Sequence, residues 1–388
     1  MSGPGDAPQA AGDDAARTSY AASGVDVHNE EHALAGLLGW VRKTFANRAV
    51  GTPGHVAVDV GYFASVLELT QTLGLAVAAD GVGTKLLVAQ LAERYEGVGI
   101  DLVAMNVNDL VCVGAEPIAM LDYVAVEVLD AKVLERVGKG LHDGAAAAGI
   151  TIAGGELAQI GAMLRGAVPG RALDLAGVAI GVVPLDRVNL GATVRAGDVV
   201  VGLASSGIHS NGLSLARKAL LERAGLKITD PLPGDPAETG GQTVADALLV
   251  PTRIYVKPAL EVLADPGVEV TALAHITGGG FANMSRIQAE VGFVLDQLPP
   301  VPPVFKAIQE AGQVPVPDLY AAYNMGVGFT FTVRPGGEAR VIEIARRHGI
   351  DAWVIGRAVE TDMQAHGRRV SLPGVGLVID DQGYRVEG

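Results

Sequence analysis

The sequence is poor in cysteine and in aromatic residues, and it has no long hydrophobic run. A single cysteine, Cys112, leaves no partner for a disulfide within the chain and no multi-thiolate zinc site, which fits a reducing, cytoplasmic setting. No apolar run approaches the roughly 18 uninterrupted residues that a transmembrane helix needs, and residues 1–17 lack the basic and apolar segments of a signal peptide. We therefore expect a protein that neither spans a membrane nor is secreted.

Positive charge is also scarce. The chain has 29 lysines and arginines against 43 aspartates and glutamates, a net charge of −14 at pH 7. Such a chain repels phosphodiester backbones, and no basic patch stands out, so we expect no binding of nucleic acid. What is abundant is apolar side chains, at 49%, and glycine, at 52 of 388 residues. A chain of this length and apolar content predicts two core-forming domains.

The order of patterns along the chain predicts an α/β (α+β) fold with two domains after a flexible tail at 1–24. In the first domain, 25–185, helical periodicity falls at 30–48, 84–95, 99–113 and 131–148, and strand-like runs fall at 58–68, 75–79, 117–127, 151–155 and 173–184. A polar, turn-rich stretch at 186–197 opens the second domain, 186–388. Its expected helices lie near 211–224, 253–264, 303–312 and 337–348, and its strands at 199–206, 271–277, 326–334, 352–360 and 375–380.

The motif ADGVGTK (79–85) joins an expected strand to an expected helix. Asp80 could bind a divalent cation, while Gly81 and Gly83 would let backbone N–H groups approach phosphate oxygens. Lys85 would add a countercharge at the helix N-terminus. An ordinary Asp-Gly turn capped by Thr84 explains the same residues, and the spacing does not separate the two interpretations. The chain has neither a Walker A loop nor a GxGxxG fingerprint.

A second motif, GIDLVAMNVNDLVCVGAEP (99–117), is an apolar helix pattern that carries Asp101, Asn106, Asn108 and Asp109. Carboxylate and carboxamide oxygens suit hard cations such as Mg²⁺. The alternative is helix capping and solvated polar positions. We favour the ligand interpretation because an unpaired carboxylate is costly to bury in so apolar a helix.

Glycine pairs and triplets mark three further candidates. IAGGELAQ (152–159) presents Glu156 after a double glycine, either as a metal ligand or base or as a solvent-facing residue after a tight turn. AHITGGGFANMSR (274–286) carries three consecutive glycines before a helix, which predicts a phosphate or substrate cradle because each glycine lowers stability relative to alanine. YNMGVGF (323–329) puts Asn324 at the entry to a strand, where a bulge or a ligand contact would serve equally well.

The segment GLASSGIHSNGLSLARK (202–218) reads as a strand, a Ser/Gly loop and an amphipathic helix. Its serines and Asn211 can cap that helix, whose N-terminus can bind an anion. His209 could transfer a proton or orient a phosphate. A capping loop with an incidental histidine remains the alternative.

Taken in order, DGVGTK, GIDLVAMNVNDLVCVGAEP, GGE, SSGIHSNGLSLARK, LLVPTRIYVKP (248–258), HITGGGFANMSR and YNMGVGF resemble the phosphoribosylformylglycinamidine cyclo-ligase family, also called aminoimidazole ribonucleotide synthetase. The likeness runs from about Ser19 to the last expected strand. It implies ATP-dependent cyclisation of formylglycinamidine ribonucleotide to aminoimidazole ribonucleotide, with release of ADP and phosphate, in de novo purine biosynthesis. ATP would phosphorylate the formyl amide oxygen, and an amidine nitrogen would then displace the phosphate. Such catalysis depends mainly on positioning and charge neutralisation.

The resemblance also implies site residues, with ATP and Mg²⁺ as cofactors. The implied metal ligands are Asp80, Asp109 and Glu156. The implied ATP contacts are Gly81, Gly83, Thr84, Lys85, Asn108 and Asp109. The implied catalytic residues are Asp80, Lys85, His209 and Asn211. The implied substrate contacts are Ser206, Gly207, His209, Thr277, Gly278, Gly279, Gly280 and Asn324.

The resemblance further implies a homodimer in which the N-terminal mixed sheets meet in a barrel-like interface, with a C-terminal α/β sandwich. The chain departs from the family at GGELAQIGA (154–162), where GGETAEMPG is common, at VGYF (60–63), where GGFG is common, and in its few early basic residues. These departures keep open a diverged ATP-dependent relative, such as a thiamine-monophosphate kinase-like enzyme, or a non-catalytic nucleotide-binding paralogue. The lone cysteine argues against selenophosphate synthetase and the hydrogenase-maturation ATPase, which use reactive cysteines.

Overall fold

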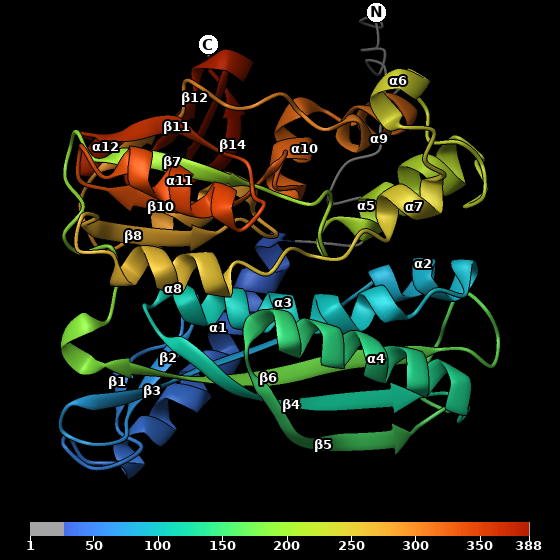
Figure 1. Ribbon diagram of the computed structural model, residues 1–388, viewed down its shortest axis with the longest axis horizontal. Helices are drawn as coiled ribbons and strands as arrows, with labels where there is room; N and C mark the ends of the chain where they lie inside the picture. Colours follow the sequence, from blue (N-terminus) through green and yellow to red (C-terminus); the bar gives the residue numbers. More distant parts are fainter. Residues whose placement is uncertain (1–26, 388) are drawn as a thin grey trace, which may run out of the picture.

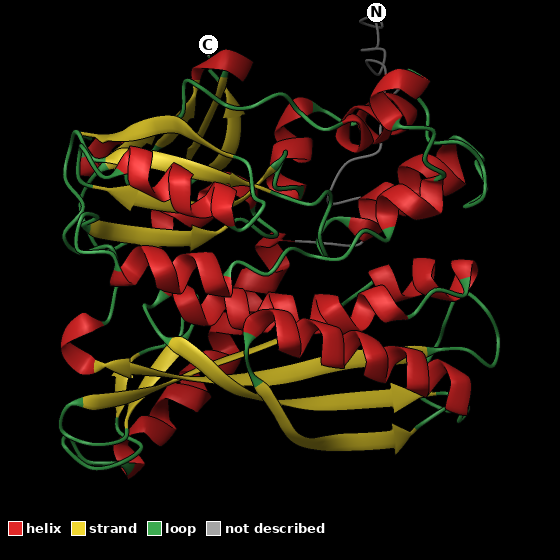
Figure 2. Ribbon diagram, in the orientation of Figure 1, coloured by secondary structure: helices red, strands yellow, loops and turns green. Residues whose placement is uncertain are grey.

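The computed structural model describes residues 27–387, so the tail predicted at 1–24 lies outside the described residues. Figure 1 shows two β-sheets with helices packed between them. Figure 2 shows the same layers coloured by secondary structure. The mixed α/β architecture with two sheets confirms the fold class at this level. None of the described helices is long and apolar enough to cross a bilayer.

The first sheet has six strands in the order β1-β2-β3-β6-β4-β5. Its strands are β1 (Val56–Val58), β2 (Ser65–Glu68), β3 (Leu73–Gly81), β4 (Glu116–Val126), β5 (Thr151–Gln159) and β6 (Leu173–Pro184). The β4–β5 pair is parallel and the other pairs are antiparallel, so the sheet is mixed as predicted. One face is covered by α2 (Lys85–Ala92), α3 (Glu96–Cys112) and α4 (Ala131–Ala148) (Figure 1).

The helix layer over this sheet is tightly packed. The side chain of Asp130 accepts hydrogen bonds from the backbone N–H groups of Lys132 and Val133, which begins α4, and Gly149 ends it at φ +78°. Glycines let α4 approach α3 closely, because a Cβ added to Gly140 would lie 1.8 Å from the carbonyl oxygen of Glu96. The backbone of α3 is therefore fixed against its neighbours.

The second sheet has eight strands in the order β14-β13-β12-β9-β11-β7-β10-β8. Its strands are β7 (Val199–Ala204), β8 (Val270–His275), β9 (Gly292–Val294), β10 (Val327–Val333), β11 (Ala352–Val359), β12 (Val370–Leu372), β13 (Leu377–Asp380) and β14 (Gly383–Val386). The remaining α-helices are α1 (Val27–Val41), α5 (Leu213–Arg217), α6 (Pro236–Thr239), α7 (Val244–Leu248), α8 (Val256–Ala264), α9 (Pro303–Gly312), α10 (Val316–Ala322), α11 (Glu338–Arg347) and α12 (Met363–His366). Strand β10 is buried on both of its faces, since all seven of its residues are buried.

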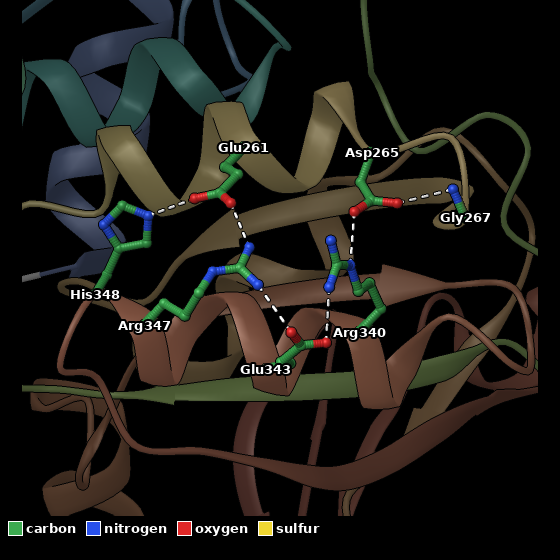
Figure 3. Close-up of polar contacts among 7 residues, drawn as sticks. All are labelled: Glu261, Asp265, Gly267, Arg340, Glu343, Arg347 and His348. Carbon is green, nitrogen blue, oxygen red and sulfur yellow. Dashed lines mark hydrogen bonds and ion pairs between the residues drawn. The ribbon is translucent and has the colours of Figure 1, made fainter.

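Helix α8 joins the two layers. It packs against α3 on one side and against α11 on the other (Figure 1). Figure 3 shows the polar contacts on the α11 side, where Arg347 lies between Glu261 and Glu343, and the Arg340 Nε donates to an Asp265 carboxylate oxygen at 2.7 Å. These ion pairs are partly exposed, so each contributes little to stability.

Several sequence expectations differ from the structure in detail. The run expected as one strand at 58–68 is two short strands separated by a turn, and the helix expected near 211–224 ends as a π-helical turn at Lys218–Arg223. Within the described residues the first sheet is open, with β1 and β5 at its edges. A barrel-like interface therefore requires a second subunit, and the domain bounds 25–185 and 186–388 stay a prediction.

Candidate functional site

Asp80 lies at the end of β3, where α3 approaches the sheet. The side chain of Asn106 holds its backbone on both sides: Oδ1 accepts from the Asp80 N–H at 3.0 Å, and Nδ2 donates to the Asp80 carbonyl oxygen at 3.3 Å. The Asp80 carboxylate accepts from the Gly81 N–H at 2.7 Å. The position of this carboxylate is thus set by a fully buried asparagine.

A second carboxylate, Asp109 on α3, lies close enough to influence Asp80. The pKa of Asp80 is raised to about 6, chiefly by burial; the Gly81 N–H opposes this rise, the charge of Asp109 adds to it, and His275 opposes it. Asp109 accepts a hydrogen bond from Nδ1 of His275 at 2.8 Å. The two carboxylates repel each other when both are ionised, so a cation between them would relieve that repulsion.

The hydrogen bonds around His275 define its tautomer. Asn108 donates from Nδ2 to the Arg253 carbonyl oxygen at 2.9 Å and accepts at Oδ1 from the Tyr255 N–H at 2.8 Å, which fixes its amide orientation. The same Nδ2 lies 3.3 Å from Nε2 of His275, which is therefore the acceptor nitrogen. The proton of His275 consequently sits on Nδ1 and is directed at Asp109.

The third predicted metal ligand, Glu156, is not part of this cluster. Asp80 pairs with Gly177, Gly177 with Asp122, and Asp122 with Gly155, so three strand spacings of about 4.8 Å separate Asp80 from Gly155. Glu156 follows Gly155 and points to the opposite face of the sheet.

The donor set that remains is two carboxylates. Within residues 27–387 no group of three or more His, Cys, Asp or Glu side chains could hold a metal ion. Mg²⁺ commonly uses only one or two protein carboxylates and takes its other oxygens from water and substrate phosphates. Asp80 and Asp109 fit such an ion.

Two loops from opposite halves of the chain meet beside these carboxylates. The Ser210 hydroxyl donates to the carbonyl oxygen of Val82 at 3.0 Å, and the Thr84 and Ser214 hydroxyl oxygens are 3.0 Å apart. We name residues 80–85 the first loop and residues 205–212 the second loop. The structure thus brings together two motifs that are more than a hundred residues apart in the chain.

Lys85 points inward rather than toward the open end of the first loop. Its side chain is fully buried and forms an ion pair with Asp101. Its Nζ also donates to the carbonyl oxygens of His209, at 3.0 Å, and Val250, at 2.7 Å. These three acceptors use all three N–H bonds of the ammonium group, so none is left for a phosphate.

His209 is also turned inward, and it adopts a left-handed backbone conformation at φ +60°. Its Nε2 accepts from the Ser206 N–H at 3.2 Å. Its ring packs directly against Gly328, where an added Cβ would lie 2.6 Å from Cε1 of the ring. Burial lowers the pKa of His209 well below its usual range. The imidazole is therefore neutral, with its proton on Nδ1.

The structure accounts for two glycines of the GGG motif by their backbone conformation and, at Gly280, by packing as well. Gly279 and Gly280 have φ of +90° and +54°, and a Cβ on Gly280 would lie 2.0 Å from the Tyr320 carbonyl oxygen. Gly278 is different: a Cβ there would lie 3.3 Å from Nδ2 of Asn211 in the second loop. The buried Oδ1 of Asn211 has no hydrogen-bond partner among the described protein atoms. This oxygen is therefore a free acceptor beside Gly278.

The other predicted substrate contacts support the loops themselves. Asn324 donates from Nδ2 to the Gly207 carbonyl oxygen at 2.9 Å, and the Ser206 hydroxyl donates to the Pro251 carbonyl oxygen at 2.6 Å. The Thr277 hydroxyl oxygen accepts from Asn283 at 3.3 Å. Gly83 has φ +67° and open space where a Cβ would be, so it remains available to a ligand.

The VGYF segment, where the chain departs from the family pattern, packs against the second half of the chain. Phe63 is buried beneath the guanidinium of Arg286, whose Cζ lies 5.0 Å from the ring centroid. The Tyr62 hydroxyl lies 3.5 Å from the Leu273 carbonyl oxygen. In the GGELAQIGA segment, the other departure from the family pattern, Leu157 is half-exposed on the edge strand β5.

Sequence reasoning did not single out His275 or the clamp role of Asn106. His275 ends an apolar strand two residues before Thr277, and a lone histidine in such a position usually reads as a packing residue. The signal available was its place at a strand end next to a glycine triplet.

Family models match both halves of the chain. The N-terminal domain of AIR synthase related proteins matches residues 61–183, and the C-terminal domain of AIR synthase related proteins matches residues 195–367. Among curated proteins, the chain is 42% identical over 352 residues to a phosphoribosylformylglycinamidine cyclo-ligase of Methanocaldococcus jannaschii, covering 91% of this chain and 95% of that protein. It is 45% identical over 332 residues to the enzyme of the same name from Pyrococcus furiosus, covering 85% and 92%.

Solved structures share the fold at much lower identity. A thiamine-monophosphate kinase from Stenotrophomonas maltophilia matches with a TM-score of 0.55 and 17% identity, covering 86% of this chain and 94% of that chain. Thermotoga maritima PurL complexed with ATP matches with a TM-score of 0.50 and 18% identity, covering 80% of this chain. This chain spans 43% of that longer chain.

The matches of both domain models define an AIR synthase-related protein. Sequence identity of 42% to a curated cyclo-ligase, over 91% of this chain, identifies the family within this class. The chain belongs to the phosphoribosylformylglycinamidine cyclo-ligase family, and it is a ligase of purine biosynthesis.

Proposed function

We propose that this protein closes the ring of formylglycinamidine ribonucleotide to give aminoimidazole ribonucleotide, with ATP converted to ADP and phosphate, in the cytoplasm. The observation that carries the proposal is the Asp80–Asp109 carboxylate pair at the junction of the two loops, in a chain whose curated relatives are named for this reaction. An amide oxygen is a poor leaving group, so its phosphorylation makes the later C–N bond formation feasible. Positioning and charge neutralisation then supply most of the rate.

The residues divide the work as follows. Asp80 and Asp109 hold Mg²⁺, and Mg²⁺ when bound neutralises phosphate charge. The N–H groups around Gly81 and Gly83 approach the ATP phosphates, since no side chain blocks Gly83. The free Oδ1 of Asn211 accepts an N–H of the substrate near Gly278. Asn106 and His275 orient the two carboxylates.

The test is ADP release by the purified protein with Mg·ATP, with and without formylglycinamidine ribonucleotide, while aminoimidazole ribonucleotide is measured in parallel. Thiamine monophosphate serves as the control acceptor because a fold neighbour is named for it. Equal amounts of ADP and aminoimidazole ribonucleotide, formed only with both substrates, support the proposal. ADP formed with thiamine monophosphate alone, or no product with either acceptor, refutes it.

The same proposal includes a homodimer that buries the open face of the first sheet. That face exposes apolar side chains: Leu121 and Tyr123 on β4 are 43% and 37% exposed, and Val178 on the neighbouring β6 is 37% exposed. A self-complementary apolar face is typical of a two-fold interface.

Light scattering on the purified protein would measure the mass in solution. We expect a dimer for the native chain and for a Met163→Glu control, which changes an exposed apolar residue outside the strands. We expect a monomer for Val178→Glu. A native monomer, or a Val178→Glu dimer of unchanged affinity, would contradict the interface.

A further inference from the structure

A buried polar cluster joins the two halves of the chain directly behind the candidate site. It consists of Lys85 on α2, Asp101 on α3 and the backbone of the second loop at His209. Lys85 and Asp101 are both fully buried, and His209 is 1% exposed. Sequence reasoning assigned Lys85 and His209 to ATP phosphates and to proton transfer, roles that require access to ligand.

The contacts of Lys85 leave it no such access. Its ammonium is shared among Asp101, the His209 carbonyl oxygen at 3.0 Å and the Val250 carbonyl oxygen at 2.7 Å. Two of these acceptors belong to the second half of the chain. If Lys85 left this position to bind a phosphate, a buried carboxylate and two buried carbonyl groups would lose the hydrogen bonds that it donates.

Asp101 extends the link to a third segment. Its Oδ1 accepts from the Thr252 N–H at 2.7 Å and from the Thr252 hydroxyl at 2.6 Å. One ion pair thus fixes the 250–252 segment and the second loop to the helices of the first half. Breaking a buried pair from one side leaves an uncompensated charge, so the two residues act as a unit.

His209 is held from both of its ends. Its carbonyl accepts from Lys85, and its Nε2 accepts from the Ser206 N–H at 3.2 Å within the same loop. Its φ of +60° is a conformation that glycine adopts at lower cost, and the loop does use glycine at the positive-φ positions Gly207 and Gly212. The strained backbone of a non-glycine residue at such a position is held by its contacts, here those with Lys85 and Ser206.

We propose that Lys85, Asp101 and His209 are positioning residues that hold the second loop against the first, and that none of them touches ATP or substrate. Their effect passes through Ser210 and Asn211 of the second loop, which they keep in contact with Val82 and Gly278. The inference rests on the proposed function for its kinetic readouts. It also has a readout that does not need activity.

The first experiment uses Lys85→Met, which keeps the length of the side chain and removes its donors. Lys139→Met on the exposed face of α4 is the matched control. For Lys85→Met we expect kcat/KM for formylglycinamidine ribonucleotide to fall on the order of 100-fold, as misplacement of catalytic groups does. The Kd for Mg·ATP, measured by calorimetry, should stay within about twofold of native, because Asp80 in the first loop and Asp109 on α3 are unchanged. A loss of Mg·ATP affinity comparable to the loss of kcat/KM would show direct phosphate binding and overturn the proposal.

The second experiment compares two substitutions of His209 and remains informative if Lys85→Met does not fold. His209→Gln can place its side-chain oxygen where Nε2 accepts from Ser206, but it cannot exchange a proton. His209→Asn suits a left-handed backbone but is too short to reach that N–H. We expect His209→Gln to retain activity within about tenfold and to keep the native kcat/KM pH profile, with a much larger loss in His209→Asn. Equal losses in both would indicate proton transfer, and full activity in both would indicate no role. Either result overturns the proposal.

The third measurement is hydrogen–deuterium exchange of the peptides that cover 205–212 and 250–252. Lys85→Met should accelerate exchange in both segments and leave α4 unchanged, whereas Lys139→Met should change neither segment. Unchanged exchange in the two segments would overturn the positioning role. If the native protein forms no aminoimidazole ribonucleotide, the proposed function fails by itself, and this exchange result still decides the positioning role.

Discussion

Replacing Asp80 with asparagine tests whether the ionised Asp80 carboxylate destabilises the folded chain. Asparagine keeps an oxygen that can accept from the Gly81 N–H, as the carboxylate does at 2.7 Å, and it removes the charge. We expect the variant to lose the ATP-dependent reaction because one of two metal ligands becomes neutral. We also expect it to be more stable than the native chain at neutral pH in the absence of metal ions.

The magnitude follows from the pKa of the buried carboxyl. Burial raises the pKa of Asp80 from 3.8 to about 6, and each tenfold change in proton affinity corresponds to about 1.4 kcal/mol. The folded chain therefore holds this proton more tightly than the unfolded chain. The resulting stability is fully present below about pH 4 and is lost as the pH rises toward about 6, a total of about 3 kcal/mol.

The assay is urea denaturation in EDTA at pH 4 and pH 7.5, followed by circular dichroism. We expect Asp80→Asn to match the native chain at pH 4 and to exceed it by about 2 to 3 kcal/mol at pH 7.5. Glu135→Gln, an exposed change on α4, controls for net charge. Addition of Mg²⁺ and ATP should stabilise the native chain more than the variant, because a ligand stabilises the state that binds it. A variant that is no more stable than native at pH 7.5 would refute the reasoning.

Three further predictions concern stability, each measured by urea denaturation. Gly280→Ala should cost more than about 2 kcal/mol because its Cβ would lie 2.0 Å from a backbone carbonyl, whereas Gly83→Ala, with open space and φ +67°, should cost about 1 kcal/mol. Asp198→Ala should cost about 3 kcal/mol, because it removes a buried carboxylate that accepts from Arg334 and from the Thr271 hydroxyl, while Arg334 keeps its ion pair with the exposed Glu269. Arg347→Ala, in the network of Figure 3, should cost less than about 1 kcal/mol, and high salt should hide the difference. A larger, salt-independent loss would show that this network supports α8 more strongly than its exposure indicates.

Much of the fold could be predicted from local patterns. The helix predicted at 131–148 matches α4, because Asp130 and Gly149 are strong end signals. The strand predicted at 58–68 was wrong in its middle, where Asp59 and Gly61 lie in a turn that interrupts an otherwise apolar run. The three-residue strand β9 was missed because both of its partners, β11 and β12, are distant in the chain. Strand β12 pairs with the nearby β13, but three residues are too few to show a strand period.

The site was predicted less completely, and the reason is geometric. Residue type identified Asp80 and Asp109, but only the crossing of β3 and α3 shows that they lie near each other. The inward direction of Lys85 depends on Val250, far away in the sequence, so no local spacing could reveal it. A motif indicates which residues matter, and long-range contacts decide what each one does.

The contacts of α3 have a consequence for the order in which the chain can fold during synthesis. Asn108 and Asp109 form their side-chain hydrogen bonds with residues 253–275, and Asp101 bonds Thr252 in addition to its ion pair with Lys85. Residues 252–275 leave the ribosome long after α3 itself. At about 5 to 20 residues per second this delay is on the order of 10 to 30 s. The strands of the first sheet are complete once β6 has been made, but the polar side of α3 is still solvated by water at that point. The nascent first half therefore lacks these hydrogen bonds of α3 until β8 has been synthesised and packs against it.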